Sequence, residues 1–292
     1  MKMVIVITGP TGTGKTELGL FLADKLNGEI INADSTQVYK GMDIATNKVK
    51  DTKGVVHHLL DIIPLEEDYT VYDYQRDARR IIDDIIAKGK TPILVGGTGL
   101  YIKAVLYDYK FAEKENNSYD NYSNEEVYNK LLEVDPNTTI HKNNRKRVVS
   151  ALNYYMANNK PYSKKEITDK LLYDTIFIGL TTDRITLYNK IDSRVDNMVE
   201  EGLIEEAKQI YDSNVRTKAV MTPIGYKELF DYFENKKELN ECLELIKQRS
   251  RNYAKRQFTW FNNQMNLKWF NVDYSDFSKT ENEILEYIKK HQ

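Results

Sequence analysis

The chain has 292 residues, a formal net charge of −2 and one cysteine, and 41% of its residues are hydrophobic. This length allows one large domain, or a core domain with a smaller one, around a sizeable hydrophobic core. The near-neutral charge excludes a strongly basic field over the whole surface, so any nucleic-acid binding must depend on local patches. The lone Cys242 excludes a disulfide framework and a thiolate zinc site, and we expect it to be a buried, inert thiol.

Signals for membrane insertion or export are not expected in this sequence. No apolar stretch reaches the length of about 18 residues that a membrane span needs. Met1 leads almost directly into the first predicted strand, which leaves no room for a signal peptide. We therefore expect a cytoplasmic protein.

The first predicted strand, residues 3–8, is apolar and β-branched, and the segment GPTGTGKT follows it directly. This segment matches G-x-x-x-x-G-K-[ST], and apolar residues at helical spacing come next. Strand, glycine loop and helix are the context of a phosphate-binding loop, whose backbone N–H groups surround an anion. An ordinary glycine-rich turn is the alternative, but it does not require the Lys–Thr pair. The candidate residues are Gly9, Pro10, Thr11, Gly12, Thr13, Gly14, Lys15 and Thr16, with Lys15 reaching the terminal phosphate groups and Thr16 reaching a Mg²⁺.

Predicted strands and helices alternate through the N-terminal part of the chain. Short apolar runs predict buried strands at 29–33 and 91–95, and a helix is expected at 72–88. A second glycine turn, GGTGLY at 96–101, opens another helix. The alternation predicts an α/β fold with a P-loop NTPase-like parallel sheet flanked by helices.

The composition changes after Tyr107. Residues 110–139 are polar and rich in Asn and Glu, which predicts a small helical inserted subdomain or lid. We therefore divide the chain into a P-loop α/β core at 1–109, the insert at 110–140, and the rest of the core with a helical part at 141–292. In this last part we expect helices at 143–157, 185–200, 203–211, 225–233 and 238–261, and strands at 175–180 and 268–272.

Asp34 is the first candidate for chemistry, because it follows an apolar strand next to the phosphate-binding loop in the predicted fold. Its carboxylate could hold Mg²⁺, as an acidic residue does in NTPases. It could instead act as a general base that takes a proton from an acceptor. A turn-forming or helix-capping Asp is the third possibility. Ser35 and Gln37 offer hydrogen-bonding groups suited to reading the edge of a base.

Thr98 is the second candidate. Two glycines precede it, so the backbone can approach a ligand closely while Thr98 supplies a hydroxyl; a tight turn with Thr98 as a helix cap is an equal alternative. The strand at 91–95 ends in glycine and has no acidic residue, so it cannot supply the second acidic motif of an NTPase. This weakens the interpretation as a plain ATPase.

Basic residues form two groups. Residues 142–147 cluster at a helix start, and a late helix interleaves cations with aromatic rings, a composition that suits a phosphate backbone and unstacked bases. A solvated helix face is the alternative. Arg184 and Arg194 could reach a diphosphate or make surface ion pairs, and His57 and His58 lack a third metal ligand. The late-helix residues are Lys247, Arg249, Arg251, Tyr253, Lys255, Arg256, Phe258 and Trp260.

Taken together, these segments resemble the bacterial tRNA dimethylallyltransferases, also called tRNA isopentenyltransferases. The resemblance covers nearly the whole chain, in order. Its motifs are GPTGTGKT at 9–16, DSTQVY at 34–39, GMDIAT at 41–46, GGTGLY at 96–101, IHKNNRKRV at 140–148, RVDNMVEEGLIEEA at 194–207, IGYKEL at 224–229 and YAKRQFTWF at 253–261.

The resemblance implies transfer of a dimethylallyl group from dimethylallyl diphosphate to N6 of the adenosine that follows the tRNA anticodon. The phosphate-binding loop and Arg194 would hold the diphosphate with Mg²⁺, and ATP would not be a phosphoryl donor. Asp34 would be the general base and Thr98 would assist at the flipped adenosine. The implied partner is the anticodon stem-loop, bound by a monomer. The implied tRNA contacts are Asp34, Ser35, Thr36, Gln37, Thr98, Lys146, Arg147 and Ser150.

The chain departs from the family pattern in several places, among them the residues that follow Ile140-His141 and the short loops near 48–53 and 212–218. Ser150 stands where the family usually has a cation, and the insert is shorter than in the family. Two other functions stay open at this point. A P-loop kinase of a small metabolite or nucleoside would not need the basic and aromatic helix 247–261, and an RNA-binding protein without catalysis would not need Lys15, Thr16 and Asp34 together.

Overall fold

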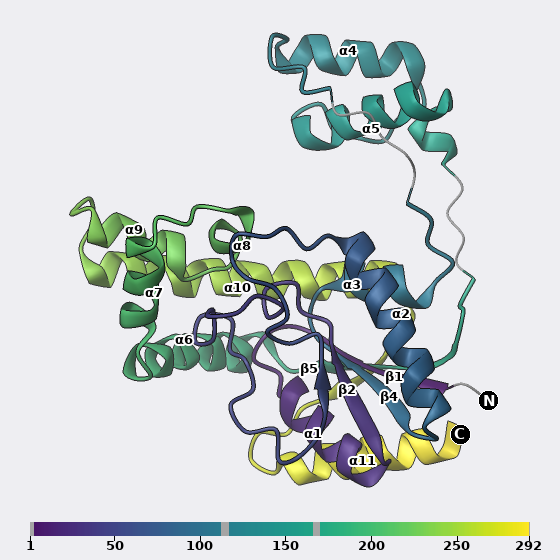
Figure 1. Ribbon diagram of the computed structural model, residues 1–292, viewed down its shortest axis with the longest axis vertical. Helices are drawn as coiled ribbons and strands as arrows, with labels where there is room; N and C mark the ends of the chain where they lie inside the picture. The colour runs from purple at the N-terminus through teal and green to yellow at the C-terminus, as the bar shows by residue number, and fades with distance from the viewer. Residues whose placement is uncertain (1–2, 112–116, 166–169, 292) are drawn as a thin grey trace. The chain divides into compact units, whose positions relative to one another are not determined.

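The computed structural model describes residues 3–111, 117–165 and 170–291. The chain forms two compact units, one made of residues Met1–Leu106 with Leu171–Gln292 and the other of Tyr107–Lys170 (Figure 1). The expected boundary at residue 140 falls inside the second unit. Residues 112–116 of the expected insert lie outside the described residues.

The first unit contains a parallel sheet of six strands in the order β3-β2-β4-β1-β5-β6. β1 lies inside the sheet, where Ile5 is in register with Ile93 on one side and with Ile176 on the other. This confirms the predicted α/β fold. The strands are β1 Met3–Thr8, β2 Gly28–Asn32, β3 His57–His58, β4 Thr91–Val95, β5 Asp174–Thr181 and β6 Lys268–Asn271.

Helices cover the sheet because their apolar stripes need a partner surface. α1 and α11 pack against each other and share one core with β1, β4 and β5, in which Leu18, Leu22, Ile284 and Ile288 are buried. α2 packs against α3 and against β2 and β4. These helices are α1 Lys15–Lys25, α2 Val71–Ala87, α3 Gly99–Leu106 and α11 Phe277–His291.

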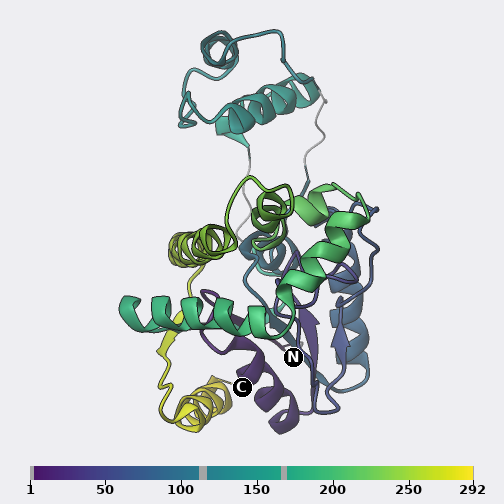
Figure 2. The ribbon, with the colours of Figure 1, turned by 90° about the vertical axis from the view of Figure 1, so that its left-hand side faces the viewer.

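The C-terminal part is largely helical, as predicted, and its helices form a second layer with its own core. Tyr226 and Leu229 on α9 and Ile246 on α10 are buried there, together with Val38 and Met42 from the segment after β2. α10 packs against α6 and α9, and Figure 2 shows α10 close to end-on. The helices of this layer are α6 Arg184–Glu200, α7 Leu203–Asp212, α8 Lys218–Met221, α9 Tyr226–Phe233 and α10 Leu239–Gln264.

The second unit is a helical pair with a small core. α4 Asn124–Val134 begins at a capping box between Ser123 and Glu126, and α5 Arg145–Asn158 packs against it. Leu131 on α4 and Leu152 on α5 belong to a common buried cluster. The helix expected at 143–157 is therefore present but belongs to this unit, because its apolar face is buried against α4.

Candidate active site

The phosphate-binding loop joins β1 to α1 in a conformation that requires glycine. Gly9, Gly12 and Gly14 have φ angles of +135°, +87° and +82°. A Cβ atom at Gly9 would lie 2.4 Å from the carbonyl oxygen of Leu180 on β5. The loop therefore lies directly against the sheet, and α1 begins at Lys15 with its free N–H groups at the loop.

Two cationic side chains meet at this loop. Nζ of Lys15 donates a hydrogen bond of 2.7 Å to the carbonyl oxygen of Pro10. Nη1 of Arg194, which comes from α6, donates a hydrogen bond of 2.6 Å to the hydroxyl of Thr11. The sequence left open whether Arg194 points to the surface or to the phosphate-binding loop, and the structure places it at the loop.

The electrostatics of these cations favour an anionic ligand. Burial, and then the charge of Arg194, lower the pKa of Lys15 to about 7, although Asp34 acts in the opposite direction. Burial lowers the pKa of Arg194 to about 10 against the opposing charges of Asp34 and Glu201. Both pKa values are lowered mainly because burial destabilises the positively charged form of the side chain. The negative charge of a bound diphosphate would raise both pKa values again.

Asp34 follows β2, and one of its carboxylate oxygens stabilises a turn. Oδ1 accepts hydrogen bonds from the backbone N–H of Thr36 at 2.9 Å and from the Thr36 hydroxyl at 2.7 Å. The backbone N–H of Asp34 in turn donates to Oδ1 of Asn32 at 3.1 Å. The turn-forming role is therefore real, but it uses only Oδ1 within the described part of the chain, and Oδ2 can face a substrate.

Thr98 links the loops that follow β2 and β4. Its hydroxyl oxygen accepts a hydrogen bond of 3.0 Å from the backbone N–H of Ser35, and its backbone N–H donates to the carbonyl oxygen of Ala33 at 3.0 Å. Gly96 lies so close to Ala33 that a Cβ atom at Gly96 would lie 2.3 Å from the Ala33 carbonyl group. The absence of a side chain at Gly96 therefore allows the two loops to touch.

These groups open into one cavity of about 980 Å³ within the first unit. Three predicted loop residues do not line it: Gly9 and Pro10 shape the loop, and the buried Thr13 donates a hydrogen bond of 2.9 Å to the Pro10 carbonyl oxygen. The predicted residues that do line it are Thr11, Gly12, Gly14, Lys15, Thr16, Asp34, Ser35, Thr36, Gln37, Thr98 and Arg194.

Helix α10 supplies lining residues that sequence reasoning assigned differently or missed. Tyr253 and Arg256, for which the sequence left RNA contact and a solvated helix face open, line the cavity. Gln257 was not singled out at all, although it follows Tyr253 by one helical turn and so shares its face. Burial raises the pKa of Tyr253, as does the charge of Asp34, whereas hydrogen bonds with the side chains of Thr98 and Gln257 lower it.

Three cations of α10 are occupied by ion pairs. Lys247 pairs with Asp196 at 2.8 Å and Arg251 with Asp192 at 2.5 Å, while Arg249 pairs with the fully buried Glu228. These pairs join α10 to α6 and α9. These three side chains therefore form neither a solvated helix face nor free RNA contacts, and Arg249 also lines the cavity.

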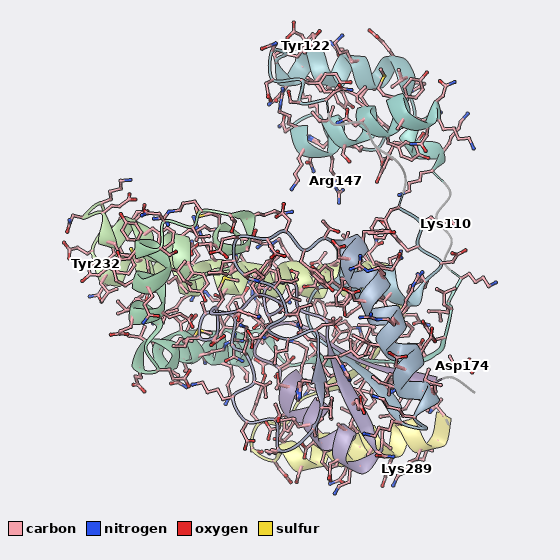
Figure 3. The ribbon with its side chains drawn as sticks, viewed as in Figure 1. Lys110, Tyr122, Arg147, Asp174, Tyr232 and Lys289 are labelled. Carbon is pink, nitrogen blue, oxygen red and sulfur yellow. The ribbon has the colours of Figure 1, made fainter. Side chains whose placement is uncertain are left out.

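The remaining predicted tRNA contacts lie in the second unit. Lys146 and Arg147 are exposed in the first turn of α5, and Ser150 is half-buried one turn later. Figure 3 shows the Arg147 side chain projecting from the side of α5 opposite α4. Lys146 and Arg147 do not belong to the buried α4–α5 cluster, and their charged side chains are exposed to solvent.

The two histidines are accounted for by their surroundings. His58 lies 2.7 Å from a carboxylate oxygen of the buried Glu29, and Lys90 donates to the same carboxylate at 2.8 Å. His57 lies 3.0 Å from the carbonyl oxygen of Val55. His58 therefore makes a structural contact with the buried Glu29 carboxylate.

Comparisons with known proteins identify the family of this chain. A family model described as IPP transferase matches residues 37–264. A tRNA dimethylallyltransferase of Anoxybacillus flavithermus is 47% identical over 300 residues, which cover 99% of this chain and 96% of that protein. The chain belongs to the IPP transferase family. The predicted family and its transferase class are thereby confirmed.

Solved structures of IPP transferase relatives have the same fold. The full-length tRNA isopentenylpyrophosphate transferase of Bacillus halodurans superposes with a TM-score of 0.76 at 39% identity, covering 99% of this chain and 98% of that one. A eukaryotic dimethylallyltransferase acting on tRNA superposes with a TM-score of 0.86 at 32% identity, covering 98% of this chain and 78% of that one. The fold of this IPP transferase family member is therefore shared over nearly its whole length.

The side chains present fit one kind of metal site. No group of three or more His, Cys, Asp or Glu side chains that could hold a metal lies within residues 3–111, 117–165 and 170–291. Thr16 lines the cavity next to Lys15 and offers a hydroxyl oxygen. Mg²⁺ is commonly held by few protein oxygens together with phosphate oxygens and water. The site thus fits a Mg²⁺ that is bound mainly through a diphosphate.

The same described residues contain no helix with the length and apolar character that crossing a bilayer requires.

Proposed function

We propose that this chain transfers a dimethylallyl group from dimethylallyl diphosphate to N6 of the adenosine 3′-adjacent to the anticodon of tRNA. One observation carries the proposal: the cationic phosphate-binding loop and the Asp34–Thr98 pair line a single cavity. An anion-binding end and a proton-accepting end in one cavity suit a reaction that releases a diphosphate and a proton together. The similarity to a tRNA dimethylallyltransferase and to a eukaryotic dimethylallyltransferase acting on tRNA supports the same reaction.

The prenyl donor binds at the phosphate-binding loop. Backbone N–H groups of the loop, Lys15 and Arg194 surround the diphosphate, and the hydroxyl of Thr16 would help to hold Mg²⁺, which supplies charge neutralisation. These groups stabilise the negative charge that grows on the leaving diphosphate as the allylic C–O bond breaks. Nothing in this step needs ATP.

The prenyl chain fits the apolar part of the same cavity. Ile191, Val195 and Met198 from α6 line it together with Leu203 from α7 and Ile246 from α10. These side chains exclude water from the allylic carbon, which would otherwise be attacked by water in place of the amine. In the proposed complex these side chains form an apolar wall beside the diphosphate.

The acceptor adenine binds between Asp34 and Thr98. The exocyclic amine attacks the allylic carbon, a C–N bond forms, and the amine proton passes to Oδ2 of Asp34. The Thr98 hydroxyl positions the amine, and Ser35, Thr36 and Gln37 contact the nucleotide. The base must leave its stack to reach the cavity, which costs less in an anticodon loop because that loop is single-stranded.

The stem of the tRNA binds to cationic side chains outside the cavity. Lys146 and Arg147 are exposed and suit phosphate contacts, and Ser150 supplies a neutral contact where relatives are expected to carry a cation. One polypeptide contains all the groups that the proposed reaction uses, so we expect a monomer to suffice for activity.

A transfer assay tests the proposal. The protein is incubated with unmodified anticodon stem-loop RNA, labelled dimethylallyl diphosphate and Mg²⁺, with and without ATP. Label in the RNA without ATP supports the proposal, and Asp34→Asn is the matched inactive variant. Label-free RNA together with ATP-dependent phosphorylation of a small acceptor would overturn it in favour of a kinase.

A further inference from the structure

Gln257 bridges the two glycine loops of the site. Its Oε1 accepts a hydrogen bond of 2.9 Å from the backbone N–H of Thr11, in the phosphate-binding loop. Its Nε2 donates a hydrogen bond of 3.1 Å to the carbonyl oxygen of Gly97, next to Thr98. The side chain is buried, with 6% of its surface exposed. One amide thus spans from the diphosphate side of the cavity to the acceptor side.

The orientation of this amide is determined by its partners. A backbone N–H can only donate and a carbonyl oxygen can only accept, so one assignment of Oε1 and Nε2 satisfies both bonds. Neither a carboxylate nor a thioether offers both functions. Glutamine is therefore required by the hydrogen bonding of the site and not by volume alone.

Two glycines in the loop between β4 and α3 allow this loop to lie close to α10. A Cβ atom at Gly97 would lie 2.1 Å from Nε2 of Gln257, and one at Gly99 would lie 2.1 Å from the ring of Trp260. Both positions lack side chains where α10 comes closest. The contact between α10 and the loop before α3 is thus close and specific.

We propose that Gln257 is a positioning residue that holds the prenyl-donor loop and the acceptor loop at a set separation. On the donor side it fixes Thr11, whose hydroxyl oxygen also accepts a hydrogen bond from Arg194. On the acceptor side it fixes Gly97, whose neighbour Thr98 contacts Ser35. In this role Gln257 acts through the two loops and takes no part in bond making or proton transfer. The inference rests on the proposed function, because only a two-substrate reaction needs these loops in register.

Three variants separate this role from simple stability. Gln257→Met removes both hydrogen bonds at similar volume, and Gln257→Glu keeps the acceptor. Gln75→Met is the matched control, since Gln75 is also buried and donates to the carbonyl oxygen of Ala104 at 2.7 Å but does not line the cavity. Thermal unfolding and pyrophosphate binding are measured for all three, together with kcat and both KM values.

We expect Gln257→Met to lower kcat at saturating substrates by about 10- to 100-fold, because misplacement of about 1 Å costs that much. Gln75→Met should destabilise the protein to a similar degree and leave kcat within about twofold. Gln257→Glu should recover activity relative to wild type as the pH falls, since a protonated carboxyl group both donates and accepts.

The outcomes are distinguishable from failure of the proposed function. If the wild-type protein binds pyrophosphate but transfers no label, the proposed function fails. If the wild type transfers label and Gln257→Met keeps its kcat, or loses it only in step with Gln75→Met, the positioning role is overturned. A pH-independent defect in Gln257→Glu would contradict the two-bond bridge.

Discussion

Arg194 on α6 donates a hydrogen bond of 2.6 Å to the hydroxyl of Thr11, so a helix beginning far along the chain completes the phosphate-binding loop. The loop by itself carries one cation, Lys15. The second cation arrives from a different element and brings α6, whose apolar residues line the same cavity. Diphosphate binding is therefore a joint property of the loop and α6.

Arg194→Ala should weaken pyrophosphate binding and lower kcat for transfer by about 10²- to 10³-fold, the usual effect of removing a donor that stabilises a leaving anion. Thr11→Val is the matched control, because it removes the hydroxyl and retains the cation. Its effect should be smaller than tenfold in the same assay. Calorimetric binding of pyrophosphate that is unchanged in Arg194→Ala would exclude this residue from the diphosphate site.

The lowered pKa of Lys15 predicts that protein stability and pyrophosphate affinity both depend on pH. In the folded protein without ligand its pKa is about 7, against 10.5 ordinarily, so the unfolded chain binds more protons between these values. The contribution of Lys15 to the free energy of unfolding therefore rises with pH through this window. A bound diphosphate restores the charge, so binding takes up a proton above pH 7.

Pyrophosphate affinity of the wild type should consequently fall by up to about tenfold per pH unit above pH 7, relative to Lys15→Arg. Arginine stays protonated throughout this range, and the ionisation of pyrophosphate is common to both proteins. Isothermal titration at several pH values measures the difference. Parallel pH profiles for the two proteins would show that Lys15 does not titrate on binding.

Asp34→Asn should abolish transfer and leave tRNA affinity within a few fold. The amide Oδ1 still accepts the Thr36 hydrogen bonds that hold the turn, while the proton-accepting oxygen is lost. Single-turnover kinetics and a filter-binding assay separate the two effects. Loss of tRNA binding with unchanged turnover at saturation would refute the role as general base.

Arg147→Ala should reduce the slope of log K against log salt for tRNA binding by about one, as expected for one lost phosphate contact. Lys289→Ala is the control, since Lys289 is an exposed cation on α11 in the other unit (Figure 3). It should leave the slope unchanged. An unaltered slope in Arg147→Ala would remove this residue from the tRNA site.

Glu206 should be important for the stability of the segment after Asp34. Its carboxylate accepts hydrogen bonds from the backbone N–H groups of Asp43, Ile44 and Ala45 at 2.8, 2.9 and 3.2 Å, and from the Tyr226 hydroxyl at 2.7 Å. Glu206→Ala should lower the free energy of unfolding by about 3 kcal/mol, because four donors lose a charged partner. Denaturant unfolding measures this loss, and Glu205→Ala, at an exposed neighbouring position, is the control. Equal free energies of unfolding for the two variants would contradict the role of Glu206.

Much of the fold was predictable because it depends on local patterns. The strands at 3–8 and 91–95 were placed at their observed bounds, since a buried parallel strand is a short apolar run between turns. The membership of α5 was not predictable, because its periodicity shows an apolar face but not the partner of that face. The packing of α5 on α4 determines its unit.

The candidate site likewise contains residues that the sequence could identify and residues that it could not. Lys15, Thr16 and Asp34 stand in motifs whose spacing carries chemistry, and the cavity brings them together. Gln257 could not be found from spacing, because its partners lie 246 and 160 residues away along the chain. The ion pairs of Arg249 and Arg251 likewise depend on acidic side chains of other helices. The functional roles of the motif residues stay predictions.

The central claim is that N6 of one adenosine attacks the prenyl donor in the cavity between Lys15 and Asp34. The most direct measurement compares two stem-loops, one with adenosine after the anticodon and one with a purine nucleoside that lacks the exocyclic amine. Nucleoside mass spectrometry follows incubation with dimethylallyl diphosphate and Mg²⁺ without ATP. The account predicts N6-dimethylallyladenosine at that position in the first RNA and no product in the second. Equal modification of both RNAs, or modification elsewhere, would contradict it.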